Sequence, residues 1–140
     1  MSTPFNIRSD AALLALRPQL LLDVPSPEEP TNTGTFLHAT LRPVLKLQND
    51  PLLAVTADFL LDHHMPFAKA SRADQQRMVT ELLGRNTKLR YTVIGLITGL
   101  FTAEESAFYR QHRAELHRRL LDLAQQRVLD QLETLTSLVA

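Results

Sequence analysis

The chain has 140 residues, with 15 basic and 15 acidic side chains and no cysteine. This length predicts one domain, and the lack of thiols excludes disulfides, cysteine-ligated zinc, iron–sulfur clusters and a cysteine nucleophile. A net charge of zero is unusual for a dedicated nucleic-acid-binding module, which is more often strongly basic. The chain does not open with a basic segment followed by an apolar core, so we expect a cytoplasmic protein.

The first predicted helix is short and interrupted. It starts where Ser9 or Asp10 can cap it and covers residues 11 to about 22. Pro18 interrupts or kinks it, because proline lacks the backbone donor and crowds the preceding turn.

A linker follows this helix. Residues 24–34 contain three prolines, a glycine and mostly polar neighbours, which is typical of a connecting segment. We therefore predict that residues 1–34 form an N-terminal helical arm with its linker and that residues 35–140 form a helical bundle domain. The arm is expected to pack as a separate unit, for example on a partner subunit.

The next predicted element carries apolar residues at helical spacing from Leu37 to Phe59. Two prolines lie inside it, Pro43 and Pro51, and two interpretations stay open. One is a nearly continuous helix that is kinked at both prolines. The other is a break in which Asp50 caps a new helix with Pro51 at its first position, where proline is favoured. The apolar phase continues across Pro51, which favours the kinked helix.

Two adjacent histidines, His63 and His64, follow in a predicted loop. Together with Asp58 or Asp62 they could ligate a metal ion. A zinc site needs three or four converging ligands, however, and no HExxH-type spacing is present. We therefore expect structural or exposed histidines and predict neither a metal nor any other cofactor.

A capped helix is predicted from Ser71 to Leu83, and Gly84 is expected to end it in a left-handed cap. The central helix, Lys88–Phe101, comes next. It is apolar on most sides, which is typical of a helix buried in a core. A membrane-spanning helix needs about 20 apolar residues, and the apolar run here is much shorter.

Gly95 and Gly99 are four residues apart in the central helix and therefore share one face. Each costs roughly 1 kcal/mol relative to alanine in a helix interior, which suggests that the close approach of another group compensates. Three interpretations stay open: tight packing within the chain, a pairing face between two chains, or a ligand slot lined by backbone.

The sequence Thr102-Ala-Glu-Glu has the spacing of a capping box, with Glu105 three residues after the threonine. The helix that it starts has no proline or glycine as far as Ala140, which predicts a length of roughly 50 Å. A compact monomer does not need so long a helix, so we expect a homo-oligomer, specifically a dimer. The predicted helix-packing or oligomer face comprises Gly95, Gly99, Leu121, Val128, Leu132 and Leu135.

An antiparallel hairpin about Thr102 would gather positive charge at one end of this neutral chain. The candidate anion-binding patch comprises Arg85, Lys88, Arg90, Arg113, Arg118 and Arg119. Close to it we expect Arg110, His112 and His117. The patch could bind phosphate groups, meet an acidic surface of a partner or second subunit, or be neutralised within the fold by Asp74, Glu81, Glu115 and Asp122.

Taken together, these patterns predict an all-α fold: a bundle of about five helices around the central apolar helix and the long C-terminal helix. No serine-hydrolase, P-loop or dinucleotide-binding motif occurs, so we predict a protein that is not an enzyme. The first hypothesis for its function is a helical protein-interaction or oligomerisation module without membrane association. The alternative is a binder of a phosphate-bearing ligand or nucleic acid through the Arg-rich patch.

Overall fold

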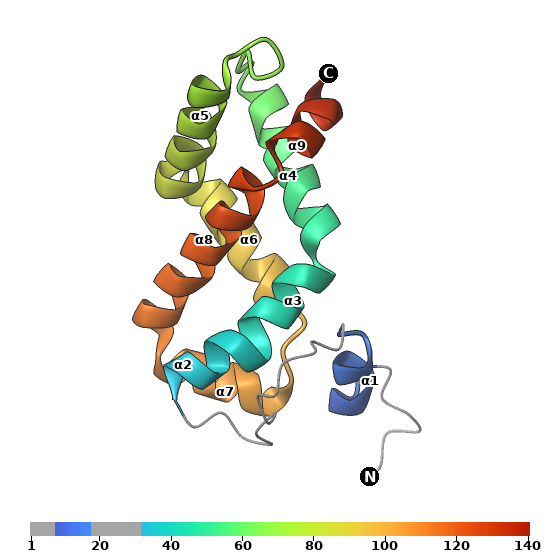
Figure 1. Cartoon of the computed structure of the whole chain (residues 1–140). Helices are drawn as coiled ribbons and strands as arrows, with labels where there is room; N and C mark the ends of the chain where they lie inside the picture. Colours follow the sequence, from blue (N-terminus) through green and yellow to red (C-terminus); the bar gives the residue numbers. More distant parts are fainter. Residues whose placement is uncertain (1–7, 18–31) are drawn as a thin grey trace.

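The computed structural model describes residues 8–17 and 32–140. These residues are largely helical and include no strand, which confirms the all-α prediction. In the described ranges, no helix combines the length and the apolar character needed to cross a membrane. In chain order (Figure 1), the elements are α1 (Asp10–Ala15), α2 (Thr33–Phe36), a π-helical segment η1 (Leu37–Leu41), α3 (Arg42–Leu47), α4 (Asn49–Asp62), α5 (Arg72–Arg85), α6 (Thr87–Thr98), α7 (Ala103–Gln111), α8 (Arg113–Leu129) and α9 (Leu132–Val139).

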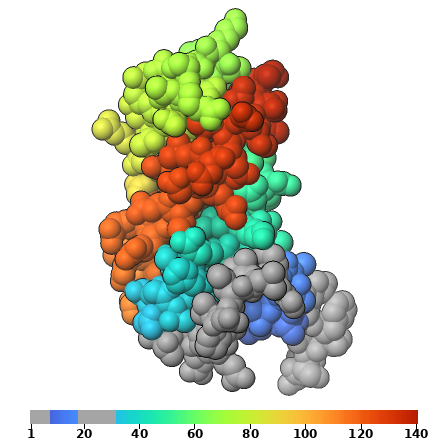
Figure 2. Space-filling model, viewed as in Figure 1, coloured from blue at the N-terminus to red at the C-terminus, as the bar shows by residue number. Residues whose placement is uncertain are grey.

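Helix α6 lies at the centre of the bundle, as the sequence predicts. It contacts α4, α5 and α8, and its residues Leu89, Val93 and Ile97 are fully buried. Figure 1 shows an elongated molecule in which α4 and α9 pack together on one side and α5 and α8 on the other, while α2 and α7 close one end. In Figure 2, α8 and α9 form a continuous strip across one face of the molecule.

The backbone around Pro43 is helical but not uniformly α-helical. Pro43 cannot donate a hydrogen bond, and the turn before it widens into η1. The Arg42 amide donates to the Leu37 carbonyl, five residues back, so the helix continues into α3. Thr40 is buried within η1, and its hydroxyl reaches Glu105 of α7.

Gln48 separates α3 from α4. Its backbone leaves the α-helical region (φ −94°, ψ 18°), although the Leu52 amide still donates to its carbonyl at 2.9 Å. Its side-chain amide donates to the Leu96 carbonyl of α6 at 3.0 Å. The two helices are therefore nearly continuous, as predicted, but the interruption falls three residues before Pro51 and Asp50 is not the cap.

Helices α5 and α6 share a cap residue. The side chain of Ser71 caps α5, as predicted, but the helix passes through Gly84 and runs to Arg85. Within the described residues no glycine has a positive φ, so the predicted left-handed cap at Gly84 is wrong. Asn86 ends α5 and also caps α6, because its side chain accepts a hydrogen bond from the Leu89 amide at 2.9 Å.

The prediction of one long C-terminal helix is wrong. His112 (φ −120°, ψ 32°) separates α7 from α8, and Gln131 (φ −129°, ψ 36°) precedes α9. The side-chain amides of Asn49 and Gln131 donate to each other at 2.9 and 2.7 Å, and α9 turns there to pack along α4. The expected length of roughly 50 Å therefore gives no reason to infer an oligomer.

Helix α1 packs on the turn between α6 and α7 of its own chain. Arg17 forms an ion pair with Glu105, and the Asp10 carboxylate accepts a hydrogen bond from the Ala103 amide at 3.1 Å. Pro18, the predicted second half of this helix and most of the predicted linker lie outside the described residues.

Candidate anion-binding cleft

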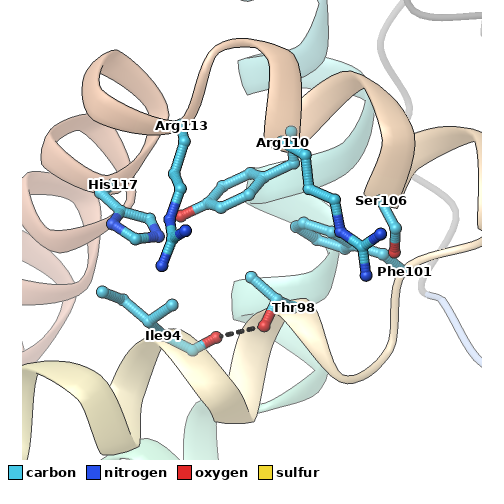
Figure 3. A pocket seen from close by; sticks show the side chains of 8 residues that line it. Ile94, Thr98, Phe101, Ser106, Arg110, Arg113 and His117 are labelled. Carbon is cyan, nitrogen blue, oxygen red and sulfur yellow. Dashed lines mark hydrogen bonds between the residues drawn. The ribbon is translucent and has the colours of Figure 1, made fainter.

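A cleft with a volume of about 280 Å³ opens where α6 faces α7 and the start of α8. In Figure 3 the side chains of Arg110 and Arg113 extend from α7 and α8 towards α6. Its apolar part is formed by Ile94 and Phe101. Its polar part is formed by Thr98, Ser106, Tyr109, Arg110, Arg113 and His117.

An aromatic cluster holds α7 against α2 beside the cleft. Phe36 stacks on Phe108 with 5.1 Å between ring centroids and meets Phe101 edge-on at 5.5 Å. The ring of Tyr109 packs against Phe101, also at 5.5 Å. Each such pair stabilises by about 0.5–1.5 kcal/mol beyond its buried area. The cluster therefore fixes the position of Tyr109 and, through α7, of the neighbouring Arg110.

The capping box at the start of α7 is present, as predicted. The Thr102 hydroxyl accepts from the Glu105 amide at 3.3 Å, and the Glu105 carboxylate accepts from the Thr102 amide at 2.9 Å. Arg17 and Thr40 donate to the same carboxylate. Burial acts to raise the pKa of Glu105, but these hydrogen bonds and the charge of Arg17 together hold that pKa below its usual value. Ionised Glu105 thus joins α1, η1 and α7 next to the cleft.

The two arginines of the cleft carry positive charge without an acidic partner in the described part of the chain. Ion pairs there involve Arg17, Arg72 and Arg77, and none involves Arg110 or Arg113. Both cleft arginines are exposed. No ion pair among the described residues therefore supports the hypothesis that acidic side chains of the same chain neutralise the charge of Arg110 and Arg113.

The three hydroxyl groups of the cleft differ in what they can donate. Thr98 donates to the Ile94 carbonyl at 2.8 Å, the dashed line in Figure 3, so its proton is already engaged. Ser106 is half-buried. The Tyr109 hydroxyl is buried and finds no hydrogen-bond partner among the described residues. Burial raises the pKa of Tyr109, which the charge of Arg113 opposes only partly, so this hydroxyl stays protonated.

His117 lies beside Tyr109, with 5.3 Å between the ring centroids, and Tyr91 of α6 meets it edge-on at 6.4 Å. Partial burial lowers the pKa of His117, and the charges of Arg113 and Arg90 lower it further. Because the usual pKa of histidine is about 6.5, His117 is neutral at pH 7. Burial and the two arginine charges together thus disfavour a further positive charge at His117.

The members of the predicted basic patch differ in how they lie relative to the cleft. Arg113 lines the cleft, and Arg90 lies close enough for its charge to act on His117. The other four residues are exposed and do not line the cleft: Arg85, Lys88, Arg118 and Arg119.

The sequence prediction places Arg110 and His117 only near the patch and omits Ser106 and Tyr109. The sequence does contain a signal for the cleft residues other than Tyr109, because residues 106, 110, 113 and 117 have the spacing of one helical face. The burial of the Tyr109 hydroxyl has no such signal, since it depends on helices that are distant in the sequence.

The predicted helix-packing or oligomer face divides into two groups. Four of its members pack in the core of the chain: Leu121, Val128, Leu132 and Leu135. Gly95 is exposed on α6, and Gly99 is exposed as the C-cap of that helix. Outside the helix no described atom approaches within 4 Å of the space that a side chain at Gly95 would take. Tight packing against the described part of the chain therefore does not explain Gly95.

The paired histidines lie at the end of α4. His63 and His64 are exposed, and the Nδ1 atom of His63 lies 2.8 Å from the Phe59 carbonyl oxygen. No group of three or more histidine or acidic side chains in the described ranges is placed to hold a metal ion.

Known proteins give no guide to the role of the cleft. No protein-family model matches the chain, and no similar protein was found among curated proteins or solved structures. A function for this protein therefore has to be inferred from the geometry of the cleft.

Proposed function

We propose that the protein binds an anionic, phosphate-bearing ligand in the cleft between α6, α7 and α8, and that its role is binding and not catalysis. The strongest support is that Arg110 and Arg113, which form no ion pair with any described residue, share the cleft with Tyr109. The buried hydroxyl of Tyr109 has no hydrogen-bond partner among the described residues. Guanidinium groups suit phosphate because their N–H donors match its oxygens in a bidentate geometry.

The electrostatics of the cleft support an anion. Burial and the charges of Arg113 and Arg90 lower the pKa of His117, so a further positive charge is disfavoured at this place. An anion held between Arg110 and Arg113 would offset that field. Because both arginines are exposed, binding should weaken as ionic strength rises.

An NMR titration of the ¹⁵N-labelled protein with inorganic phosphate, at constant ionic strength, tests this proposal. We expect saturable shifts at the amides of residues 94–98 and 106–117. Arg110→Ala/Arg113→Ala should abolish them. The matched control is Arg118→Ala/Arg119→Ala, which removes the same charge from exposed positions of α8 outside the cleft and should leave binding intact.

Two results would contradict the proposal. Equal loss of binding in both double variants would mean that phosphate responds to the overall charge and not to the cleft. Shifts that do not saturate in the wild-type protein would mean that there is no site. Binding of a single-stranded oligonucleotide, with an affinity that falls steeply with salt and depends on Arg118 and Arg119, would instead assign the exposed arginines to nucleic acid.

A second candidate is a cytoplasmic interaction module that forms a homodimer, and one exposed face of α6 favours it. Tyr91 and Gly95 are four residues apart in α6 and share that face, and Gly99 follows at the same spacing as the C-cap. Tyr91 is 59% exposed, and the space beside Gly95 is open to a second helix. Sedimentation equilibrium tests this candidate: a dimer that dissociates in Gly95→Leu would support it, and a monomer at all concentrations would contradict it.

A further inference from the structure

We infer that the ligand of the cleft is a phosphate monoester, whose terminal phosphate accepts a hydrogen bond from the Tyr109 hydroxyl while it lies between the guanidinium groups of Arg110 and Arg113. This inference rests on the proposed function and names the chemical class of its ligand. A sugar phosphate and a phosphorylated side chain share this chemistry.

The buried hydroxyl of Tyr109 is the first observation behind it. The residue is only 5% exposed, and in the described chain its hydroxyl has no partner. Phenylalanine would keep the ring contacts with Phe36 and Phe101 and would avoid burying an unpaired donor, which is unfavourable. A buried donor beside two exposed cations therefore points to an acceptor that the described residues do not supply.

The shape of the cleft selects a terminal phosphate. Tyr109 and Arg110 come from α7 and Arg113 from α8, and all three residues line the cleft. Solvent does not reach the hydroxyl, so a ligand in the cleft can contact it only after a neighbouring side chain moves aside. A monoester has one substituent, which can point outwards, whereas a phosphodiester within a strand is flanked on both sides. Arg113 is exposed, so its side chain can turn to admit the ligand.

The charge of a monoester suits the surroundings of His117. Four residues surround His117. Tyr109 lies on α7, Arg113 lies on α8 together with His117, and Tyr91 and Arg90 lie on α6. A phosphate monoester carries a charge of about −1.5 to −2 at pH 7, because its second pKa is about 6. A bound dianion would offset the two arginine charges and therefore raise the pKa of His117.

The experiment compares methyl phosphate with dimethyl phosphate by calorimetry and NMR on the full chain. We expect methyl phosphate to bind at least about ten times more tightly and to raise the pKa of His117. Tyr109→Phe should weaken methyl phosphate binding about tenfold or more while leaving the Tm unchanged or higher. The matched control is Tyr91→Phe, which removes an exposed hydroxyl outside the cleft and should change neither quantity.

The outcomes separate this inference from the proposed function. If Tyr109→Phe binds methyl phosphate normally, or both esters bind equally, the inference is overturned, while phosphate binding that needs Arg110 and Arg113 still supports the proposed function. If no anion binds at all, both are overturned. A clear fall in the Tm of Tyr109→Phe would give the hydroxyl a structural role and overturn the inference. Glucose 6-phosphate and a phosphoserine peptide, used as further probes, distinguish a metabolite from a phosphorylated protein, and tight binding of either supports a monoester.

Discussion

Arg17 and Glu105 are 88 residues apart in the sequence and form a bidentate ion pair, with N–O distances of 2.5 and 2.7 Å. Only 7% and 10% of their side chains are exposed. Arg17 also donates to the Leu100 carbonyl at 3.1 Å, in the turn between α6 and α7. The pair therefore attaches α1 to the bundle at the turn that leads into the cleft.

Removing the charge of Glu105 should release α1. We expect Glu105→Gln to lower the free energy of unfolding by about 2–3 kcal/mol, because hydrogen bonds to a charged group are lost. This is less than the loss of about 3–5 kcal/mol that is typical of a broken buried pair, since α1 can detach and return Arg17 to water. Urea unfolding measures the loss, and hydrogen exchange should show that the amides of α1 lose protection.

Glu104, the residue before Glu105, provides the control for Glu105→Gln. Glu104→Gln makes the same change of charge in the same turn of α7, but Glu104 is exposed. Its effect should stay within about 0.5 kcal/mol. Equal effects of the two variants would mean that the ion pair does not stabilise the fold.

The pKa of Glu105 predicts how this stabilisation depends on pH. Its hydrogen bonds and the charge of Arg17 hold that pKa below the usual 4.5, against the effect of burial. The folded state therefore binds protons less readily than the unfolded chain, so the contribution is complete above about pH 4.5 and is lost as pH falls through the folded-state value. The difference in Tm between the wild type and Glu105→Gln should shrink as the pH falls below 4.5. A difference that stays constant would contradict the assignment.

The elements that could be predicted from the sequence depend on residues that are close together. The capping box of Thr102 and Glu105 and the cap at Ser71 join groups three residues apart, so their spacing is visible in the sequence. The burial of α6 follows from its apolar composition in the same way. The position of Arg113 near other basic residues could also be predicted, because the helices before and after Thr102 are joined by only a few residues and are expected to pack antiparallel.

The features that could not be predicted depend on distant partners. The breaks at His112 and Gln131 occur without proline or glycine, and the second is held by Asn49, 82 residues away. The role of Glu105 as a partner of Arg17 has no local signal either. The packing of distant helices also decides which hydroxyl of the cleft is buried without a partner, so Tyr109 could not be selected from its position alone.

A double-mutant cycle tests the break before α9. Asn49→Ala and Gln131→Ala should each destabilise the fold, with a coupling energy of about 0.5–1.5 kcal/mol, because the two amides donate to each other. Urea unfolding of the four proteins gives this energy. Gln126 and Asp130 form an exposed side-chain pair within one turn, and their cycle, the control, should give only about 0.2–0.5 kcal/mol. Additive effects at Asn49 and Gln131 would mean that another contact determines the break.

His117 should make the fold sensitive to mild acid. Burial and the charges of Arg113 and Arg90 lower its pKa, so the unfolded chain takes up a proton before the folded protein does. Stability should therefore fall as the pH drops below about 6.5 and level off below the folded-state pKa. His117→Asn should reduce the difference in Tm between pH 7.5 and pH 5.5. The control is His64→Asn, which removes an exposed histidine at a positive φ that asparagine tolerates. An equal change in both variants would contradict the role of His117.

Gly95 within α6 and Gly99 at its C-cap should respond differently to substitution by alanine. At Gly95 no described atom outside the helix lies within 4 Å of the new methyl group, so Gly95→Ala should raise the free energy of unfolding by about 0.5–1 kcal/mol. At Gly99 the methyl group would stand 2.9 Å from the Gly95 carbonyl oxygen, so Gly99→Ala should give no gain or a loss. Thermal unfolding at several protein concentrations measures both. A loss in Gly95→Ala that depends on protein concentration would instead show that a second chain covers this face, because the methyl group would then meet a partner that a monomer lacks.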